Sequence, residues 1–278
     1  MPKSIFPDYL CPKIIAMYLF RIFLFGLIFM VSAPAFAWGT TGHRVVAEIA
    51  ENHLSCKAKR EIKKIIGKQP LAYWANWPDF IKSNPDWKMA DSWHYLNFPE
   101  GLNRTGFDQT LENSSDENLY KRALLLMEDL KNHKNLSLEK KQEDLYFLIH
   151  LIGDAHQPLH IGREEDLGGN KIQVEWFREQ TNLHSLWDSK LVDFQQYSYT
   201  EYAEVLDFHD KKFNKKFAEG NLNDWLFDSY QKSENIYANV KAGDKLWFNY
   251  NYDYVSVLEE QLLKGGLRLA KVLNEVFG

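Results

Sequence analysis

The most constraining feature of this sequence is the run from His150 to His160, which reads HLIGDAHQPLH. The residues before it sort apolar and charged side chains at helical spacing, which predicts a helix over 146–157 that Pro158 ends. Residues four apart share one face of a helix, so His150 and Asp154 can point an imidazole and a carboxylate at the same place. His160, just past the break, can fold back toward them.

An imidazole and a carboxylate on an apolar helix are costly to bury unless a partner satisfies both, and a divalent cation is such a partner. A single histidine in an apolar helix is more often a hydrogen-bonded core residue than a ligand. Three histidines and an aspartate within this short run favour a metal site instead. His156 faces another side of the helix from His150, so we expect it to lie outside the ligand set.

The first 37 residues are typical of a secretory signal peptide that is removed from the mature protein. Three basic residues precede or enter the apolar run 22–31, and a small-x-small cleavage pattern ends at Ala37. This apolar run is too short for a transmembrane span. We therefore predict a cleaved leader over 1–37, a mature chain that begins at Trp38, no membrane anchor after cleavage, and a secreted or periplasmic location.

The charge balance argues against a broad basic face for duplex nucleic acid. The whole chain has 33 basic and 38 acidic residues, and the leader holds three of the former and one of the latter, which leaves a mature chain of about −7. Proteins that grip duplex nucleic acid normally carry a cationic excess. A polyanionic substrate must then be held by local positive charge, which bound metal can supply. Cys56 has no partner in the mature chain, so no intrachain disulfide can form there.

Helical periodicity dominates the mature chain. Apolar residues recur at helical spacing over 42–67, 113–130, 181–195, much of 198–237, and 254–276. An extended piece is expected around His94, and the alternating run 171–177 after a glycine-rich loop predicts one arm of a hairpin. Strand signals are few, so we predict a mainly α protein whose residues 38–278 form a single compact helical domain with a short β-hairpin.

Further metal-ligand candidates lie outside the central run. The pair His184 and Asp188 repeats the spacing of four on a second predicted helix, which strengthens the case made by the first pair. His43 follows closely on the predicted new N-terminus. His94 lies among aromatic residues, where on its own it is better explained by a core hydrogen bond. We expect surface positions for His53, His133 and His209, and the pattern cannot choose among Asp79, Asp86 and Asp91.

Taken together, these residues resemble the S1/P1 nuclease family of zinc-dependent single-strand nucleases with 3′-nucleotidase activity. The resemblance covers the chain from Trp38 to Asp188, in the family's order and spacing; the rest matches as generic helix. The matching motifs are Trp38-Gly-x-x-Gly-His43, Asp79, Trp93-His94-Tyr95, His150-x3-Asp154-x-His-Gln-Pro-Leu-His160, Gly168-Gly-Asn170 and His184-x3-Asp188.

The resemblance implies a helical fold of the phospholipase C / P1 nuclease type with three zinc ions in a cleft. One zinc would be held by Asp79, His94, His150 and Asp154. A second would be held by the α-amine and carbonyl oxygen of Trp38 with His43 and Asp154, whose carboxylate would bridge the two ions. The third would be held by His160, His184 and Asp188. Removal of the leader would then be a maturation step, because an amide nitrogen cannot replace the free amine.

The resemblance also implies roles in catalysis and substrate binding. Asp79 would orient the attacking water, and Lys82 would neutralise charge that develops on the phosphate. A base would stack on Tyr95 and hydrogen-bond Asn97, with Asn170 beside it, and only unpaired bases offer these faces and edges. The substrates would be single-stranded DNA, RNA and nucleotides, with 5′-nucleotides as products and no stable protein partner. Fungal members carry phenylalanine and aspartate at the positions of Tyr95 and Asn97, so the base preference stays open.

Two other functions are compatible with parts of the sequence. A zinc-dependent phospholipase C shares the three-metal architecture and the N-terminal tryptophan, but that group ends its last metal motif with glutamate where this chain has Asp188. A periplasmic zinc-binding or interaction module would use similar ligands without open coordination positions. It would have no phosphodiesterase activity.

Overall fold

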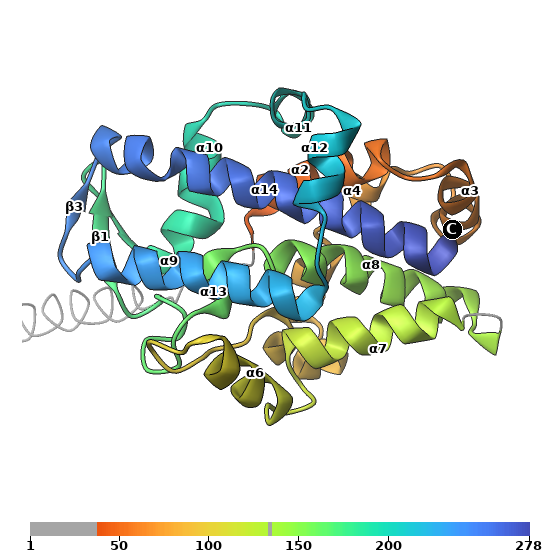
Figure 1. Cartoon of the computed structure of the whole chain (residues 1–278), viewed down its shortest axis with the longest axis horizontal. Coiled ribbons are helices and arrows are strands. Elements are labelled where there is room, and N and C mark those ends of the chain that lie inside the picture. Colours follow the sequence, from red (N-terminus) through yellow and green to blue (C-terminus); the bar gives the residue numbers. More distant parts are fainter. Residues whose placement is uncertain (1–37, 133–134) are drawn as a thin grey trace, which may run out of the picture. The chain divides into compact units, whose positions relative to one another are not determined.

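The computed structural model describes residues 38–132 and 135–278, so the predicted leader and His133 lie outside the described residues. Helices dominate, as Figure 1 shows, and the mainly α prediction is confirmed. Within the described part, no helix is long and apolar enough to cross a membrane. The described residues belong to one compact unit.

The elements follow one another as a series of helices interrupted by one small sheet. The first half of the described chain contains α2 (Thr40–Asn52), α3 (Cys56–Ile66), α4 (Leu71–Trp74), α5 (Trp77–Phe80), the 3₁₀ helices η1 (Ile81–Ser83) and η2 (Pro85–His94), α6 (Arg104–Glu112), α7 (Leu119–Lys131), α8 (Leu138–Asp154) and the 3₁₀ helix η4 (Pro158–Ile161). The second half contains β1 (Gln173–Trp176), β2 (Glu179–Asn182), α9 (Leu183–Ser185), the π-helix η5 (Leu186–Lys190), α10 (Leu191–Phe194), α11 (Tyr199–Leu206), α12 (Lys211–Phe217), α13 (Leu222–Asn239), β3 (Lys245–Leu246) and α14 (Phe248–Phe277).

Polar caps set several helix starts that apolar periodicity alone misplaced. The single helix predicted over 42–67 is two helices, because the Ser55 side chain accepts a hydrogen bond from the backbone of Ala58 and starts α3 there. The helix predicted from residue 113 begins at Leu119, where Asn118 is the N-cap. α14 begins at Phe248, six residues before the predicted start, in a stretch whose aromatic residues obscured the helical signal.

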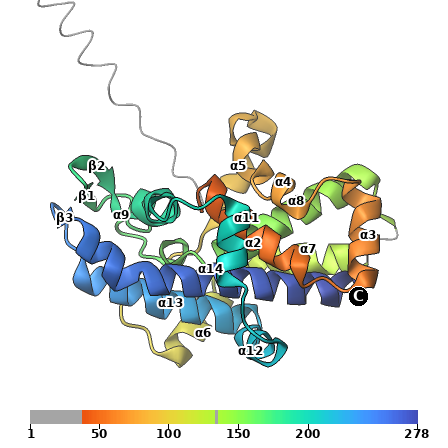
Figure 2. The same ribbon diagram turned by 90° about the horizontal axis from the view of Figure 1, so that it is seen from above.

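The core forms where α2 packs between α14, α11 and α8. Figures 1 and 2 show α14 running past α2, and α7 lying along α8. Close approach of α2 to α14 requires Gly266, because a Cβ built there would lie 2.5 Å from Cβ of Ile49. This packing fixes the first turn of α2, which carries His43, against the end of α8, which carries Asp154.

α8 begins at Leu138, after the N-cap Ser137, and it ends at Asp154 rather than at the predicted residue 157. The residue before a proline is biased away from helical geometry, so the chain leaves the helix before Pro158 and turns through Ala155–Gln157. The 3₁₀ helix that follows carries His160 back toward the helix end, as the sequence predicted.

The predicted hairpin is confirmed as β1 paired antiparallel with β2, with Val174 opposite Thr181. β3 adds in parallel on the other side of β1, which gives the strand order β2-β1-β3. The helix predicted over 181–195 is therefore wrong at its start, because Thr181 and Asn182 belong to β2. The extended piece expected around His94 begins one residue later, since His94 is the last residue of η2.

Candidate metal centre

Buried histidines and aspartates gather into groups whose nitrogen and oxygen atoms lie close enough to hold metal ions. In the described part of the chain there are three such groups, and within each the candidate ligand atoms lie within 4.8 Å of one another. The groups are His43, His150 and Asp154; Asp79, His94 and His150; and His160, His184 and Asp188. The residues come from seven different elements, so tertiary packing rather than local sequence brings them together.

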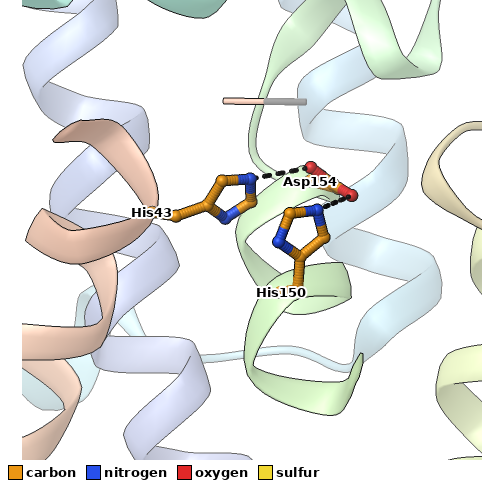
Figure 3. A group of neighbouring side chains, drawn as sticks. All are labelled: His43, His150 and Asp154. Atoms are coloured by element: carbon orange, nitrogen blue, oxygen red, sulfur yellow. Dashed lines mark ion pairs between the residues drawn. The ribbon is translucent and has the colours of Figure 1, made fainter. Parts of the chain in front are cut away.

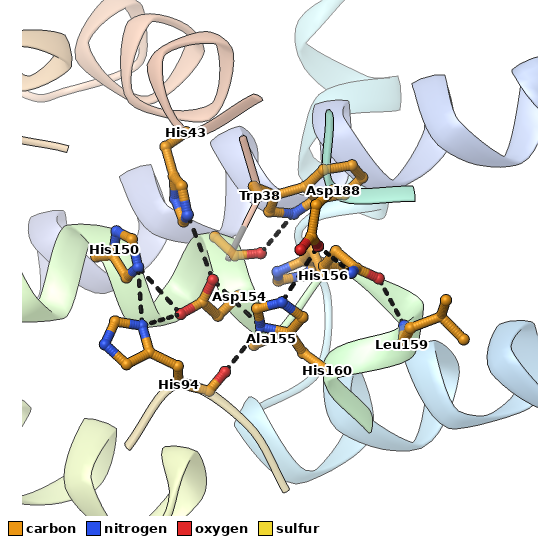
Figure 4. A network of polar contacts seen from close by, with 12 residues as sticks. Trp38, His43, His94, His150, Asp154, Ala155, His156, Leu159, His160 and Asp188 are labelled. Carbon is orange, nitrogen blue, oxygen red and sulfur yellow. Dashed lines mark hydrogen bonds and ion pairs between the residues drawn. The ribbon is translucent and has the colours of Figure 1, made fainter. Parts of the chain in front are cut away.

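Asp154 lies at the centre of this arrangement and has no exposed surface. Its Oδ1 lies 3.3 Å from Nε2 of His43, and its Oδ2 lies 3.1 Å from Nδ1 of His94 and 3.3 Å from Nε2 of His150. Nδ1 of His160 lies 3.3 Å from Oδ1. The imidazoles of His43 and His150 stack on each other, with ring centroids 3.8 Å apart, and Figure 3 shows that both point a nitrogen at the carboxylate. Figure 4 shows the wider network.

Backbone carbonyl oxygens fix the tautomers of three histidines. Nδ1 of His150 donates to the carbonyl oxygen of Ala75 at 2.7 Å, and Nδ1 of His184 donates to that of Gly168 at 2.6 Å. Nδ1 of His160 donates to the carbonyl oxygen of His94 at 2.8 Å. Because a carbonyl oxygen only accepts, each Nδ1 carries the proton and each Nε2 presents a lone pair to the site. This outer hydrogen bond is the usual support of a metal-binding imidazole.

Burial keeps two of these imidazoles neutral. It lowers the pKa of His150 to about 3, against the opposing effect of the Asp154 carboxylate. Burial also lowers the pKa of His94. A metal ligand must be the unprotonated imidazole, so both residues are available for a cation at neutral pH.

The donor set fits metal ions because buried polar atoms remain without hydrogen bonds. They include Nε2 of His43, Nε2 of His94, Nε2 of His160 and Oδ2 of Asp188. Native proteins leave few buried polar atoms unsatisfied, and each exception needs a physical reason. Imidazole nitrogens and carboxylate oxygens that face one another in a dry site are the ligands that zinc and similar transition metals prefer.

The third group has its own support. Nε2 of His184 lies 3.1 Å from Oδ2 of Asp188, and Nε2 of His160 lies 3.4 Å from Oδ1. Burial opposes ionisation of Asp188, but the adjacent His184 and His160 lower its pKa to about 2. The amide nitrogen of Gln157 donates to Oδ1 of Asp188, and Oε1 of Gln157 accepts from the backbone of Leu159 at 2.6 Å. Gln157 therefore ties the turn after α8 to the π-helix that carries Asp188.

Trp38 is fully buried beside these groups (Figure 4). Its indole N–H donates to the carbonyl oxygen of Gly153 at 2.8 Å. A Cβ on Gly153 would lie 2.8 Å from Nδ1 of His43, so the small residue lets the His43 ring reach the end of α8. The indole thus anchors Trp38 against the helix that carries Asp154.

Asp79 and Lys82 lie at the edge of the second group. Nζ of Lys82 lies 2.6 Å from Oδ1 of Asp79, which is 3.7 Å from Nε2 of His150. Burial opposes ionisation of Asp79, but His150 and then Lys82 lower its pKa. The two other aspartates that the pattern left open, Asp86 and Asp91, do not belong to any of the three groups.

A cavity of about 780 Å³ opens beside the metal groups. Its lining includes His94, His160 and His184 from the metal groups, together with Lys82 and the predicted substrate-binding residues Tyr95, Asn97 and Asn170. Tyr95 is 45% exposed, and Oδ1 of Asn97 is buried without a hydrogen-bond partner. The cavity therefore offers an aromatic ring and an amide within one space that reaches the metal groups.

The glycine-rich loop forms one wall of this cavity. Gly168 has φ of +63°, and a Cβ there would lie 2.5 Å from the carbonyl oxygen of Leu159, so only glycine fits. The same residue accepts the His184 hydrogen bond. Next to it, Leu167 has φ of +56° and lines the cavity with an exposed side chain. The loop thus orients a metal-group histidine and presents an apolar side chain to the cavity.

The family model described as S1/P1 Nuclease matches residues 38–278. The chain belongs to the S1/P1 nuclease family. It is 30% identical to Endonuclease 3 of Arabidopsis thaliana over 266 residues, which cover 87% of this chain and 90% of the relative. It is 27% identical to Nuclease P1 of Penicillium citrinum over 267 residues, which cover 87% of this chain and 98% of the relative. It is 30% identical to Nuclease S1 of Aspergillus oryzae over 167 residues, 56% of this chain and 55% of the relative.

Family membership makes this S1/P1 nuclease a hydrolase that cleaves nucleic acids, and it confirms the resemblance that the motifs indicated. S1/P1 nucleases are metal-dependent, and the three buried groups are where this one could hold metal ions. The geometry shares His150 between two groups, whereas the resemblance assigned it to one zinc only. His156 contacts none of the three groups and instead bonds the carbonyl oxygen of Ile152 and the guanidinium of Arg268, as expected from its place on the helix.

Sequence reasoning missed several residues that shape the site of this S1/P1 nuclease. Gln157 lies within the run that carries the main motif, and its position next to Pro158 could have marked it as a candidate helix-end contact. The carbonyl groups of Ala75 and Gly168 carry no side-chain signal, so only the folded chain reveals them. Leu167 lies in the glycine-rich loop and lines the cavity, and no motif in the sequence indicates that role.

Proposed function

We propose that this nuclease is a zinc-dependent phosphodiesterase that hydrolyses single-stranded DNA and RNA to 5′-nucleotides and also acts on 3′-nucleotides. The observation that carries the proposal is the position of three buried His/Asp groups next to a cavity that contains an exposed tyrosine ring. Imidazole-rich ligand sets favour zinc over magnesium, which prefers oxygen ligands.

The ligand assignment is the one that the family resemblance implies, and it differs from the groups described above in that two ions share Asp154 and only one contacts His150. One zinc would be held by Asp79, His94, His150 and Asp154, a second by the α-amine and carbonyl oxygen of Trp38 with His43 and Asp154, and a third by His160, His184 and Asp188. The position of Asp154 between the imidazoles of His43 and His94 supports a bridging carboxylate. The buried indole of Trp38 supports a fixed place for the first residue of the mature chain.

When bound, the zinc ions would supply a water nucleophile at neutral pH and positive charge for the leaving oxygen. The residues of the chain position and balance the reacting groups. Asp79 would accept a hydrogen bond from the attacking water and orient it toward phosphorus. Lys82, which lines the cavity and is held 2.6 Å from Asp79, would neutralise charge on the phosphate oxygens.

Single-strand preference follows from the residues that would hold the base. A base would stack on the ring of Tyr95 and bond the amide of Asn97, whose Oδ1 is buried and without a partner. Asn170 would lie beside it, with its amide nitrogen held by the carbonyl oxygen of Leu167 at 2.8 Å. Paired bases bury these faces and edges within the duplex, so a strand must be unpaired to enter.

Maturation is part of the proposal. The leader over 1–37 would be removed before Trp38, which would free the α-amine for zinc and deliver residues 38–278 as the catalytic domain to the periplasm or the outside. An α-amine loses its proton near neutral pH far more readily than a lysine, so a cation can displace that proton. No stable protein partner and no membrane anchor are required by this scheme.

The test is elemental analysis of the correctly processed protein combined with nuclease assays. We expect three zinc ions per chain, hydrolysis of single-stranded DNA and RNA, much slower hydrolysis of duplex, release of phosphate from 3′-adenosine monophosphate, and loss of all activities with a chelator. Activity that survives complete zinc removal, or equal rates on duplex and single strand, would refute the proposal.

A further inference from the structure

A ladder of neighbouring rings runs through the segment 208–217, well outside the metal groups. Phe208 contacts His209 with the ring centroids 3.9 Å apart and the planes tilted by 35°, and His209 stacks on Phe213 with the centroids 3.8 Å apart. The stack continues to Phe217 at 4.3 Å. Phe213 and Phe217 pack against the core, whereas Phe208 is 75% exposed. The ladder therefore ends in a ring with one face held by its neighbour and most of its surface open to solvent.

α12 surrounds the ladder with positive charge. Lys211, Lys212, Lys215 and Lys216 are all exposed. Among the ion pairs of residues 38–132 and 135–278, none involves any of these four lysines. Four uncompensated cations on one short helix contrast with a chain whose formal net charge is −5. Of the neighbouring acids, Asp207 pairs with His53 and Asp210 caps the helix, whereas Glu219 faces the same cavity as two of the lysines.

A second cavity, of about 460 Å³, lies between α12 and the C-terminal part of α14. Lys211, Lys215 and Lys271 line it, with Glu219 as an opposing charge. Asn214 also lines it, and Oδ1 of this residue is buried without a hydrogen-bond partner. The cavity thus combines cationic groups with an unused acceptor, which suits a ligand that carries both phosphates and N–H or O–H donors.

We propose that the segment 208–217 and this cavity form a second binding site for single-stranded nucleic acid, separate from the catalytic cavity. Phosphates would contact Lys211 and Lys215, and one base would stack on the free face of Phe208. None of these residues lines the catalytic cavity, and Figure 2 shows α12 and α5, which carries Asp79, on opposite sides of α14. The site would therefore raise the affinity for long strands without taking part in the reaction.

An anionic membrane surface is the other polyanion that a basic helix can meet, but the apolar side chains do not suit it. A membrane-bound helix inserts a continuous apolar face, and here Phe213 and Phe217 pack inward. A single exposed ring at the end of a stack fits a stacked base better. The choice of single-stranded nucleic acid as the ligand rests on the proposed function.

The test compares long and short substrates. In the zinc-loaded enzyme, we expect the double variant Lys211→Gln with Lys215→Gln to raise KM for a 30-nucleotide single strand several-fold. The slope of log KM against log salt concentration should fall by about 1.4, which is about 0.7 for each of the two lost phosphate contacts. Phe208→Leu, which keeps an apolar side chain but removes the ring, should raise KM about fivefold through the loss of base stacking. Cleavage of the dinucleotide dTpT should be unchanged in both variants.

A matched control replaces two exposed lysines at the sheet end, Lys241→Gln with Lys245→Gln, and should leave both substrates unaffected. The affinity for a labelled phosphorothioate single strand, measured by fluorescence anisotropy, tests the second site independently of cleavage. Failure of the enzyme to cleave dTpT would count against the proposed function and not against the second site. The inference is overturned if KM and affinity for the long strand are unchanged, if dTpT cleavage falls equally, or if the variants lose only binding to phosphatidylserine vesicles.

Discussion

The backbone amide of Gly39 donates a hydrogen bond to the carbonyl oxygen of Asp188 at 2.6 Å. A Cβ on Gly39 would lie 2.3 Å from Oγ of Ser189, so a larger residue does not fit this position without movement. The contact ties the residue after Trp38 to the π-helix of the third metal group. Trp38 and Gly39 are thus held between the two ends of the site, α8 on one side and the π-helix on the other.

This anchoring predicts that the first residue must be Trp38 itself. A protein with one extra methionine before Trp38 should contain one zinc fewer and lose most of its activity, because an amide nitrogen cannot replace the free α-amine as a ligand. Elemental analysis and single-strand cleavage measure both effects. Removal of the methionine with an aminopeptidase should restore the zinc and the activity. Full zinc content and activity in the extended protein would show that the terminal amine is not a ligand.

The central position of Asp154 predicts a double loss. Asp154→Asn keeps the size of the side chain but removes the charge and one oxygen ligand, so two zinc ions should leave together. Asp188→Asn is the matched control, because the proposed assignment gives Asp188 to one ion only, and it should lose one zinc. Zinc counted per folded chain distinguishes the cases. Equal losses in the two variants would argue against a bridging carboxylate.

Lys82 should matter for turnover and not for metal binding. Lys82→Met keeps the length of the side chain, so we expect the full zinc content and a fall of about 100-fold in kcat/KM on single-stranded DNA, in the range seen when one charge-stabilising donor is removed. Lys88 serves as the control, since it is 75% exposed and pairs with Asp91 on the surface. Lys88→Met should be indistinguishable from the parent. A normal rate in Lys82→Met would remove this lysine from the mechanism.

Gln157 should act on the third metal through Asp188. Gln157→Leu would remove the amide that donates to Asp188 while it keeps a side chain of similar size, and we expect zinc affinity of that group to fall about 10- to 100-fold. The other two ions should be retained. Stepwise zinc extraction with a chelator of known affinity measures the change. An unaltered extraction profile would mean that Asp188 is positioned without Gln157.

The sequence predicted the parts of the site that depend on local spacing. The two pairs four residues apart, His150 with Asp154 and His184 with Asp188, lie on single helical stretches, so their geometry follows from helix periodicity. The break at Pro158 likewise predicted the return of His160. The mainly α class followed from the same periodicity, because long amphipathic segments have few other ways to bury an apolar face.

Other features depend on long-range packing, which spacing does not encode. The pattern could not choose among three aspartates, and the fold selects Asp79 because α5 brings it to α8, while Asp86 is exposed. The chain breaks into two helices before Ser55, where the serine caps the second helix. The apolar periodicity continues across this break, so the pattern does not reveal it. The support of His150 by the carbonyl of Ala75 involves a backbone atom, which has no sequence signature.

The three metal groups should differ in their response to acid. Burial opposes protonation of His160, but the carboxylates of Asp154 and Asp188 raise its pKa above the ordinary 6.5. In the metal-free protein, protonated His160 therefore stabilises the fold at pH values below the pKa that His160 has in the unfolded chain. This stabilisation is lost as the pH rises through the higher pKa of His160 in the folded protein. The same proton competes with zinc, so zinc at the third group should weaken at a higher pH than the zinc that His150 holds.

At His150 the proton competes only near pH 3, the value to which burial lowers its pKa. Dialysis against a weak chelator at stepped pH should therefore release the zinc of the third group in an earlier step than the zinc held by His150. His184→Ala, which lacks a ligand of the third group, should lose that early step and keep the later ones. If the early step persisted in this variant, the zinc released first would belong to another group and the assigned role of His160 would be wrong.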